Sequence, residues 1–480
     1  MTKQLMKGML EMDKKNEKNQ AEKLQEKLLS NHKHGGLILS DDKLKKADKF
    51  CEGYKDFINK SKTEREFVNQ TIELVKKNGF EEYDSDKQYK EGDKFYYNNR
   101  GKAIILTVMG KKSLAEGIKI AAAHIDSPRL DLKQNPLYED KEVALFKTHY
   151  YGGIKKYQWT TIPLSLHGVI VKADGETVTV NIGEDKGDPV FCVTDLLPHL
   201  ADEQMKRPAP QLIKGEELNI LVGSRPFKDD DISEKVKLNI MKILNEKYGI
   251  VEDDFISAEL EAVPAFKASD VGFDRSMIGG YGQDDRVCAY PALQAILKCK
   301  NPKYTCLTIL TDKEETGSDG NTGLNSSYLP YFINKLAKMQ GLDGYNVMSA
   351  SECLSADVNA AVDPTFPDVT EIRNASQINY GVVATKFTGS RGKSGTSDAS
   401  AEFVGKIRRL FDKNNIIWQT GELGKVDMGG GGTVAQYVAN LNIDVIDVGV
   451  PVLSMHAPFE VTAKIDVYMA FKAFSVFFEQ

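Results

Sequence analysis

Apolar residues along the chain occur in two arrangements, one typical of helices and one typical of buried strands. Residues 41–77 carry aromatic and aliphatic side chains at helical spacing. Residues 102–108 (KAIILTV) and 118–124 (IKIAAAH) are short apolar runs, the pattern of strands that are covered on both faces. The first part of the chain therefore predicts helices combined with buried strands.

The pattern changes after about residue 130. Short extended runs are then separated by turns rich in Gly, Asp and Lys, which predicts a compact, largely β module; the runs are 162–171, 177–182 and 190–193. After about residue 255, strands and helices alternate again. Strands are expected at 304–311, 346–351, 382–387 and 445–452, and helices at 285–298, 324–339 and 399–411.

Alternating strands and helices on both sides of a β-rich stretch predict an α/β fold with a second domain inserted into it. We expect one discontinuous domain, made of residues 1–130 and 251–480, and an inserted β-rich domain of residues 131–250. Residues 429–432 are all glycine, but the lysine and the spacing of a phosphate-binding P-loop are missing.

Composition narrows the class of protein. The 480 residues include 63 Lys and Arg against 69 Asp and Glu, a net charge of −6, which gives no electrostatic reason to expect nucleic acid as a partner. No apolar run reaches the roughly 18–20 residues that span a bilayer, so no membrane partner is expected. Residues 1–35 are rich in Lys and Glu, predicting a solvated helix or arm and not a secretory signal. The six cysteines are scattered, which favours reduced thiols in a soluble cytoplasmic protein.

Imidazole and carboxylate groups gather where predicted elements begin or end. In open α/β sheets, ligands bind beyond the carboxyl ends of the strands, so these positions are candidates for a site. The candidates after strands are His124, Asp126, Glu314, Glu315, Asp357 and His456, and Asp284 opens the helix expected at 285–298. Each motif alone also has an ordinary structural interpretation: a capped histidine, a solvated pair of glutamates, or an aspartate that caps a helix.

Two histidines and three carboxylates are a donor set that suits a pair of Zn²⁺ ions. A two-ion hydrolytic centre needs a bridging carboxylate and a free carboxylate that serves as general base. Glu315 and Glu314 can divide the tasks of ligand and base, and Asp126 can orient His124 from behind. Glu314 and Glu315 also follow one of the most apolar strands, where unpaired carboxylates would be costly.

Six motifs in order, AAHIDSP, QDDR, DKEETGS, SADVNAAVDP, GGGGT and LSMHAPFE, make the chain from about residue 102 onward resemble the aspartyl aminopeptidase family of dinuclear zinc metallopeptidases. The resemblance implies an α/β, mixed-sheet metallopeptidase domain with an inserted β-rich dimerisation domain. It also implies two divalent ions per chain, most often Zn²⁺, although Mn²⁺ or Co²⁺ would fit the same donors. One ion is expected on His124, Asp284 and Asp357, the other on Asp284, Glu315 and His456, with Glu314 as general base.

The resemblance further implies peptides with a free N-terminus as substrates, a preference for an N-terminal Asp or Glu, and a homo-oligomer that is built from dimers, often a dodecamer. In relatives a histidine of the inserted domain reaches a neighbouring subunit's active site, and His199 lies in the corresponding region. An acidic side chain needs a cation, for which Arg391 and Lys393 are the candidates. The sequence departs from the family pattern at Asn359, where a histidine is common, and in the residues that follow His456.

Three functions remain open from the sequence. The first is an aminopeptidase, with acidic or with neutral or basic specificity. The second is a carboxypeptidase or deacylase of the same two-ion class, which would need an arginine for the substrate carboxylate. The third is a non-catalytic assembly subunit, against which the complete set of ligands and the base argue.

Overall fold

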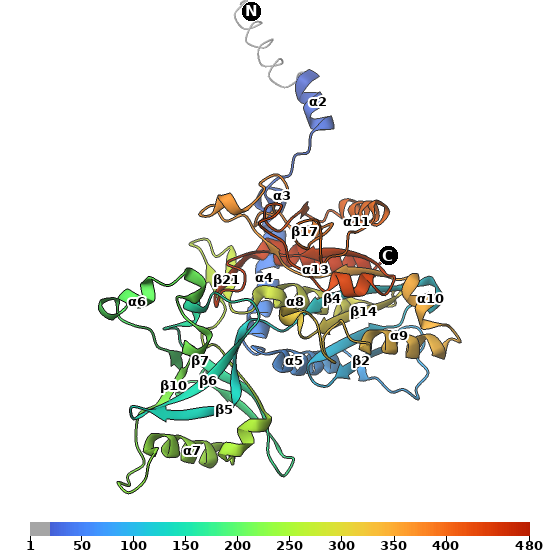
Figure 1. Ribbon diagram of the computed structural model, residues 1–480. Coiled ribbons are helices and arrows are strands. Elements are labelled where there is room, and N and C mark those ends of the chain that lie inside the picture. Colours follow the sequence, from blue (N-terminus) through green and yellow to red (C-terminus); the bar gives the residue numbers. More distant parts are fainter. Residues whose placement is uncertain (1–19) are drawn as a thin grey trace, which may run out of the picture.

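The structure is a computed structural model and describes residues 20–480. Its largest element is a nine-stranded mixed sheet with the strand order β1-β2-β3-β14-β4-β15-β19-β17-β18 (Figure 1). The strands are β1 (Glu81–Glu82), β2 (Lys94–Asn99), β3 (Ala103–Val108), β14 (Thr305–Thr311), β4 (Ile118–His124), β15 (Glu352–Ser355), β19 (Asp444–Gly449), β17 (Val382–Thr385) and β18 (Trp418–Thr420). The four central strands, β14, β4, β15 and β19, run parallel to one another.

Both faces of this sheet are buried, which explains why its strands read as continuous apolar runs. In β3, Ile104 and Leu106 belong to one hydrophobic cluster while Ile105 belongs to another on the opposite face. This two-residue alternation is the pleat of a strand. Each face therefore has its own core, and the strands between them are covered on both sides.

Helices form these two cores. The first cluster includes residues of α4 (Asp41–Ile58), α5 (Glu64–Lys77), α8 (Gln283–Lys298), α11 (Ala401–Lys413) and α13 (Lys464–Phe478). The second includes residues of α9 (Tyr328–Met339), α10 (Gly344–Ser349) and α12 (Ala435–Ala439). No helix within residues 20–480 is both long and apolar enough to cross a lipid bilayer.

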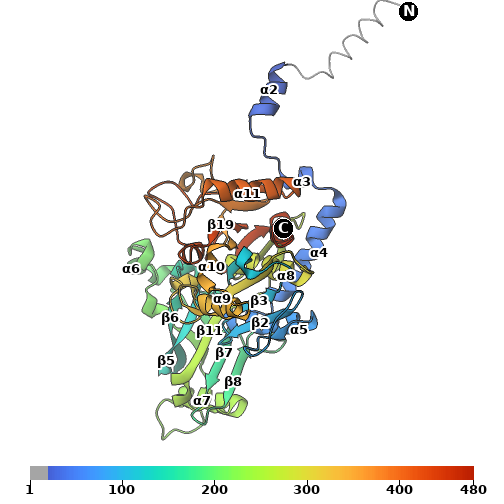
Figure 2. The ribbon, with the colours of Figure 1, turned by 90° about the vertical axis from the view of Figure 1, so that its right-hand side faces the viewer.

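A second sheet of seven strands has the order β8-β7-β11-β5-β6-β10-β9 and its own hydrophobic core. Its strands are β5 (Arg129–Asp140), β6 (Val143–Tyr151), β7 (Leu164–Val171), β8 (Thr177–Ile182), β9 (Cys192–Val193), β10 (Ile220–Gly223) and β11 (Ala258–Pro264), with α6 (Asp202–Met205) and α7 (Lys235–Tyr248) beside it. This part lies to one side of the nine-stranded sheet (Figures 1 and 2). Because β11 follows residue 250, the sheet reaches past the end of the predicted β-rich stretch.

A small five-stranded sheet, with the order β12-β13-β21-β20-β16, carries several connections near the site. Its strands are β12 (Ser269–Val271), β13 (Met277–Gly280), β21 (Glu460–Ala463), β20 (Pro451–Leu453) and β16 (Asn359–Ala360). At the other end of the chain, α2 (Gln20–Leu28) points away from the body with all its residues exposed, and α3 (Gly35–Ile38) precedes α4 (Figure 1). The rest of the predicted N-terminal arm, residues 1–19, lies outside the described residues.

The strand predicted at residues 346–351 is wrong. These residues belong mostly to the helix α10, whose N-terminus is capped by the side chain of Asp343, which accepts the N–H of Tyr345. Val347 and Met348 are adjacent in sequence and both buried, which a helix end packed against α9 allows. The strand β15 begins only at Glu352, after the chain has turned.

Two other predictions were too coarse. The run at residues 445–452 is two strands in two different sheets, because the chain leaves the nine-stranded sheet after Gly449 and enters the five-stranded sheet at Pro451. Residues 41–77 form two helices, α4 and α5. The second begins at a capping box, in which the Thr63 side chain accepts the N–H of Glu66 and the Glu66 carboxylate accepts the N–H of Thr63.

Candidate metal centre

Three of the predicted segments meet at one edge of the nine-stranded sheet. His124 is the last residue of β4, which pairs in parallel with both β14 and β15. Glu314 and Glu315 lie in the 3-10 turn that follows β14, and Asp357 follows β15. Because neighbouring parallel strands end at the same edge, these side chains are brought together by strand pairing alone.

Asp284 and His456 arrive from outside this sheet. Asp284 lies in the first turn of α8, where its backbone (φ −80°, ψ 108°) is not helical, and His456 lies between β20 and β21 with a φ of 64°. The buried carboxylate of Glu460 joins the two turns. It accepts the backbone N–H of Gln283 at 2.6 Å, of Asp284 at 3.3 Å and of His456 at 2.7 Å.

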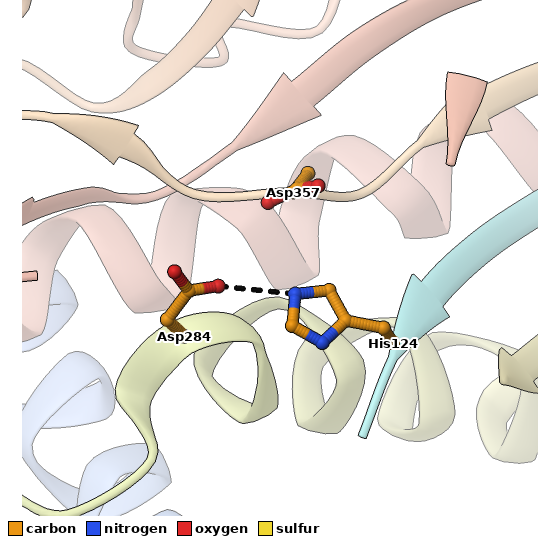
Figure 3. Close-up of side chains that lie close together, drawn as sticks. All are labelled: His124, Asp284 and Asp357. Carbon is orange, nitrogen blue, oxygen red and sulfur yellow. Dashed lines mark hydrogen bonds and ion pairs between the residues drawn. The ribbon is translucent and has the colours of Figure 1, made fainter. Parts of the chain in front are cut away.

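The five predicted ligands form two groups, in each of which the ligand atoms lie within 4.8 Å of one another. The first group is His124, Asp284 and Asp357, which face a common centre in Figure 3, and the second is Asp284, Glu315 and His456. Asp284 belongs to both. Its Oδ1 lies 3.1 Å from Nε2 of His124, and its Oδ2 lies 3.2 Å from Nε2 of His456.

The electrostatics of this cluster fit divalent cations. Burial raises the pKa of Glu315 and of Asp357 well above the ordinary carboxyl range, and neighbouring carboxylates add to the effect. Oε1 of Glu315 is buried and, within residues 20–480, has no hydrogen-bond partner. Burial also opposes ionisation of Asp284, but hydrogen bonds from His124 and His456 hold its pKa below its usual value. Crowded carboxylates with an unpartnered oxygen and two imidazoles are a donor set for zinc.

Glu314 stands beside both groups without belonging to either. Its Oε2 lies 3.8 Å from Nε2 of His124, and its carboxyl lines a cavity of about 370 Å³. Burial raises the pKa of Glu314 to about 7, and the nearby charge of Asp284 acts in the same direction. A carboxyl with a pKa near neutrality, within reach of a reacting molecule, has the properties of a general acid and base.

Asp126 lies beside the His124 ring, and its carboxylate makes further contacts. Its Oδ1 is 3.3 Å from Nδ1 of His124, and the same nitrogen is 3.1 Å from the backbone carbonyl of Asp126. The carboxylate also accepts the backbone N–H groups of Glu314 and Glu315, both at 3.2 Å. Sequence reasoning missed this link, and it missed the Tyr151 hydroxyl, which donates to Oδ2 at 2.7 Å.

The cavity opens between the metal-ligand candidates and the glycine-rich loop. It is lined by Gly153, Asp284, Glu314, Glu315, Asp357, Val358, Asn359, Thr388, Leu423, Gly430, Gly431, Gly432, Thr433, Met455 and His456. Asn359, where the family pattern has a histidine, is buried and donates through its side-chain amide to Oγ1 of Thr385 at 3.2 Å. Sequence reasoning did not assign residues 430–433 to a site, since glycines alone carry no chemical signal.

The three residues predicted to contact substrate do not line this cavity. His199 is exposed in the 3-10 turn Pro198–Leu200, beside the seven-stranded sheet. Arg391 and Lys393 line a smaller neighbouring cavity of about 50 Å³. Nζ of Lys393 lies 2.8 Å from Asp398 and 3.8 Å from the centre of the Phe387 ring, so its charge is already paired.

A family model and a curated relative match most of the chain. The family model of the aminopeptidase I zinc metalloproteases (M18) matches residues 57–478. A curated relative from Clostridium acetobutylicum, named "Probable M18 family aminopeptidase 1", is 52% identical over 461 residues, which cover 94% of this chain and 98% of the relative.

Solved structures show the same likeness. The crystal structure of an M18 family aminopeptidase from Thermotoga maritima superposes with a TM-score of 0.90 at 44% identity, covering 94% of this chain and 99% of that one. The S. cerevisiae mApe1 dodecamer shares the fold, with a TM-score of 0.74 at 21% identity over 91% of this chain and 97% of that one. A family match over most of the chain, together with these relatives, shows that the protein belongs to the M18 family of zinc metalloaminopeptidases.

Proposed function

We propose that the protein removes single N-terminal residues from peptides at a two-ion centre with Glu314 as general base. The observation that carries this proposal is the position of Asp284, which turns one carboxylate oxygen to each of two three-residue groups. One ion would be held by His124, Asp284 and Asp357, and the other by Asp284, Glu315 and His456. Zinc is the ion that the family name carries, and Mn²⁺ or Co²⁺ would fit the same donors.

Two ions held there would polarise the scissile carbonyl and lower the pKa of a water molecule. Glu314 accepts the proton of the attacking water on its carboxylate and passes it to the nitrogen of the leaving amine. Its pKa, which burial raises to about 7, suits a group that must first accept and then donate near neutral pH. Asp126 holds Nδ1 of His124, which leaves Nε2 directed at the centre.

The buried carboxylates also explain a requirement for a free N-terminus. They form one wall of the cavity, where the α-ammonium of a peptide would be attracted and held. A peptide with a blocked N-terminus lacks that charge, so cleavage is confined to the first residue. Acetylated and free forms of one peptide, compared as substrates, test this part of the proposal: equal turnover of the two would contradict it.

We propose a preference for peptides that begin with Asp or Glu, with Arg391 and Lys393 as the cations that attract the side chain. Both line the small cavity next to the site, together with Lys425 from another segment of the chain. The pairing of Lys393 with Asp398 favours the alternative, a neutral or basic first residue. A panel of aminoacyl-coumarin substrates run with each metal separates the two. Replacing Arg391 and Lys393 together should raise KM for Asp and Glu substrates more than for Leu.

We further propose that the seven-stranded part, predicted as an inserted domain of residues 131–250, joins chains into a homo-oligomer, most simply a dodecamer as in the S. cerevisiae mApe1 structure. Exposed apolar side chains gather beside His199, namely Leu196, Leu197, Leu200 and Met205. Mass photometry measures the number of chains, and Leu200→Asp should reduce it. If His199 reaches a neighbour's site, His199→Ala should lower turnover while the number of chains stays the same.

The cysteines support a reducing compartment, and we propose the cytoplasm. All six are free thiols, and five of them are buried. Labelling with a thiol reagent after unfolding, without a reductant, should modify six cysteines per chain. Fewer labelled thiols in protein isolated from its own cells would contradict the proposal.

The decisive test of the mechanism is Glu314→Gln. The amide has the shape of the carboxylate but cannot accept the proton, so this variant should keep its metal content and lose nearly all turnover. Glu402→Gln, which alters an exposed glutamate in the first turn of α11, is the matched control and should behave as wild type. Metal analysis with peptide kinetics decides, and an active Glu314→Gln would remove Glu314 from its role.

A further inference from the structure

We propose that residues 151–153, where β6 leaves the seven-stranded sheet, are a positioning segment for both halves of the metal centre. The inference rests on the proposed two-ion function and names residues that the function itself does not require. Tyr151 acts on the His124 half through Asp126, and Gly153 acts on the His456 half through its backbone carbonyl. The seven-stranded part thus contributes to the site within a single chain.

The hydroxyl of Tyr151 fixes the carboxylate that organises the buried half. It donates to Oδ2 of Asp126 at 2.7 Å, and both residues are buried. The other contacts of that carboxylate are Nδ1 of His124 and the backbone N–H groups of Glu314 and Glu315. One carboxylate therefore sets the orientation of a ligand, of the proposed base and of a second ligand, and Tyr151 supplies its only side-chain hydroxyl donor within residues 20–480.

The ring of Tyr151 is itself held in place. The guanidinium of Arg129 lies 3.9 Å from the ring centre. Arg129 is buried and forms two ion pairs. Its guanidinium lies 3.3 Å from the carboxylate of Glu64, on α5, and 3.2 Å from that of Glu261, on β11. Packing therefore already restricts the Tyr151 ring. The hydrogen bond from its hydroxyl to Asp126 then requires little further loss of side-chain conformational entropy.

Two residues further on, the chain reaches the other half. The backbone carbonyl of Gly153 accepts a hydrogen bond from Nδ1 of His456 at 2.8 Å. This contact places the ring proton on Nδ1 and leaves Nε2 free to face Asp284 and Glu315. Between the two contacts, Gly152 has a φ of 73°, and a Cβ there would lie 3.1 Å from Oε2 of Glu315. Only glycine passes this close to the ligand without displacing it.

Tyr151→Phe tests the first contact in the full-length protein, because the ring and its packing remain. Competition with a chromophoric chelator, without substrate, should show one ion bound about 10–100-fold more weakly, and kcat should fall by a similar factor with little change in KM. Tyr328→Phe is the matched control, since it removes an equally buried hydroxyl that donates to Thr311 at 3.1 Å. Wild-type affinity in Tyr151→Phe, or an equal loss in Tyr328→Phe, would overturn the proposal.

Gly152→Ala tests the close approach of the segment to Glu315. Its control is Gly175→Ala, which imposes a similar backbone strain at a φ of 87° but has no atom within 4 Å of the added Cβ. Gly152→Ala should weaken one ion and change the visible spectrum of the Co²⁺-loaded protein, whereas Gly175→Ala should leave both unchanged. Equal behaviour of the two variants would contradict the segment's role.

Chelator competition keeps this inference separate from the proposed function. An active Glu314→Gln would refute the role of Glu314 as general base. The ion affinities of Tyr151→Phe and Gly152→Ala, measured without substrate, would still show whether residues 151–153 position the ligands. If all variants bound both ions as wild type does while Glu314→Gln were inactive, the positioning segment alone would be refuted.

Discussion

The two halves of the candidate metal centre, the groups around His124 and around His456, are built differently, although they share Asp284. The side chain of His124 is 1% exposed and stands at the end of a central strand, whereas that of His456 is 35% exposed and stands in a turn. Ladders of backbone hydrogen bonds hold the first half, since β4 pairs with β14 and β15 along most of its length. In the second half Glu315 also follows a paired strand, whereas His456 depends on single contacts, from Glu460 and from Gly153.

His124 is therefore part of the buried sheet, whereas His456 is held in a turn at the surface of the cavity. Changing His124 disturbs a buried, fully packed position, while changing His456 disturbs a turn that faces the cavity. We therefore expect a substitution of His124 to lower both activity and stability, and a substitution of His456 to lower metal binding and activity without a loss of stability. The exposed half should also release its ion first on dialysis against a chelator.

Asp284→Ala should have the largest effect, because it removes the residue that both halves share. Loss of a residue behind a ligand costs about 10–100-fold in affinity or activity, so loss of the shared ligand should leave below about 1% of wild-type turnover. Metal analysis should find neither ion at its wild-type level. A full complement of two ions would show that the halves are bridged elsewhere.

The comparison itself is tested by His124→Ala against His456→Ala. Both should lose one ion and most turnover. Only His124→Ala should also lower the free energy of unfolding of the metal-free protein by about 2–4 kcal/mol, since it leaves a cavity and removes a partner of buried carboxylates. Denaturant unfolding measures this, and equal stabilities would mean that burial does not distinguish the halves.

Glu460→Gln should weaken both halves moderately. The amide keeps one acceptor oxygen, but its NH₂ group would face the backbone N–H either of Gln283 or of His456, because these donate to different oxygens of the carboxylate. We expect a loss of about 1–3 kcal/mol in stability and a smaller fall in turnover than for a ligand variant. An effect confined to His456, seen as loss of one ion with the stability unchanged, would contradict the joining role of Glu460.

The smallest effect on turnover is expected for His167→Gln, because His167 lies on β7 and not among the candidate ligands. Burial lowers the pKa of His167, but Glu184 and Glu66 outweigh it and raise the pKa from 6.5 to about 9. The ion pairs therefore stabilise the folded protein fully below about pH 6.5, and this contribution is lost as the pH rises through about 9. The stability difference from wild type, about 1–3 kcal/mol at pH 6, should disappear by pH 9.5 with turnover unchanged at neutral pH. A stability difference between His167→Gln and wild type that does not depend on pH would contradict the role of these ion pairs.

How far the sequence predicts the structure can be followed from single residues. An apolar strand precedes His124 and indicates its place, and the parallel pairing of β4 with β15 takes His124 and Asp357 to one edge. For Asp357 the strand expected at 346–351 is wrong, because β15 begins only at Glu352. The helix α10 was missed because its three buried residues, Gly344, Val347 and Met348, carry no helical periodicity, and only its cap at Asp343 marked it. Tyr151 had no signal at all, since its partner Asp126 lies in the connection between β4 and β5 and is brought near by packing.

By itself, the sequence determined which donor groups the chain offers: imidazoles and carboxylates at the ends of elements, of types that suit zinc. It also determined the α/β class, because apolar runs and helical spacing are local properties of the chain. Tertiary structure alone decided that Asp284 serves both groups, that His124 is sealed while His456 is open, and that Tyr151 and Gly153 come from a second sheet. Those features depend on contacts between segments far apart in the chain, and local pattern carries no information about distance in space.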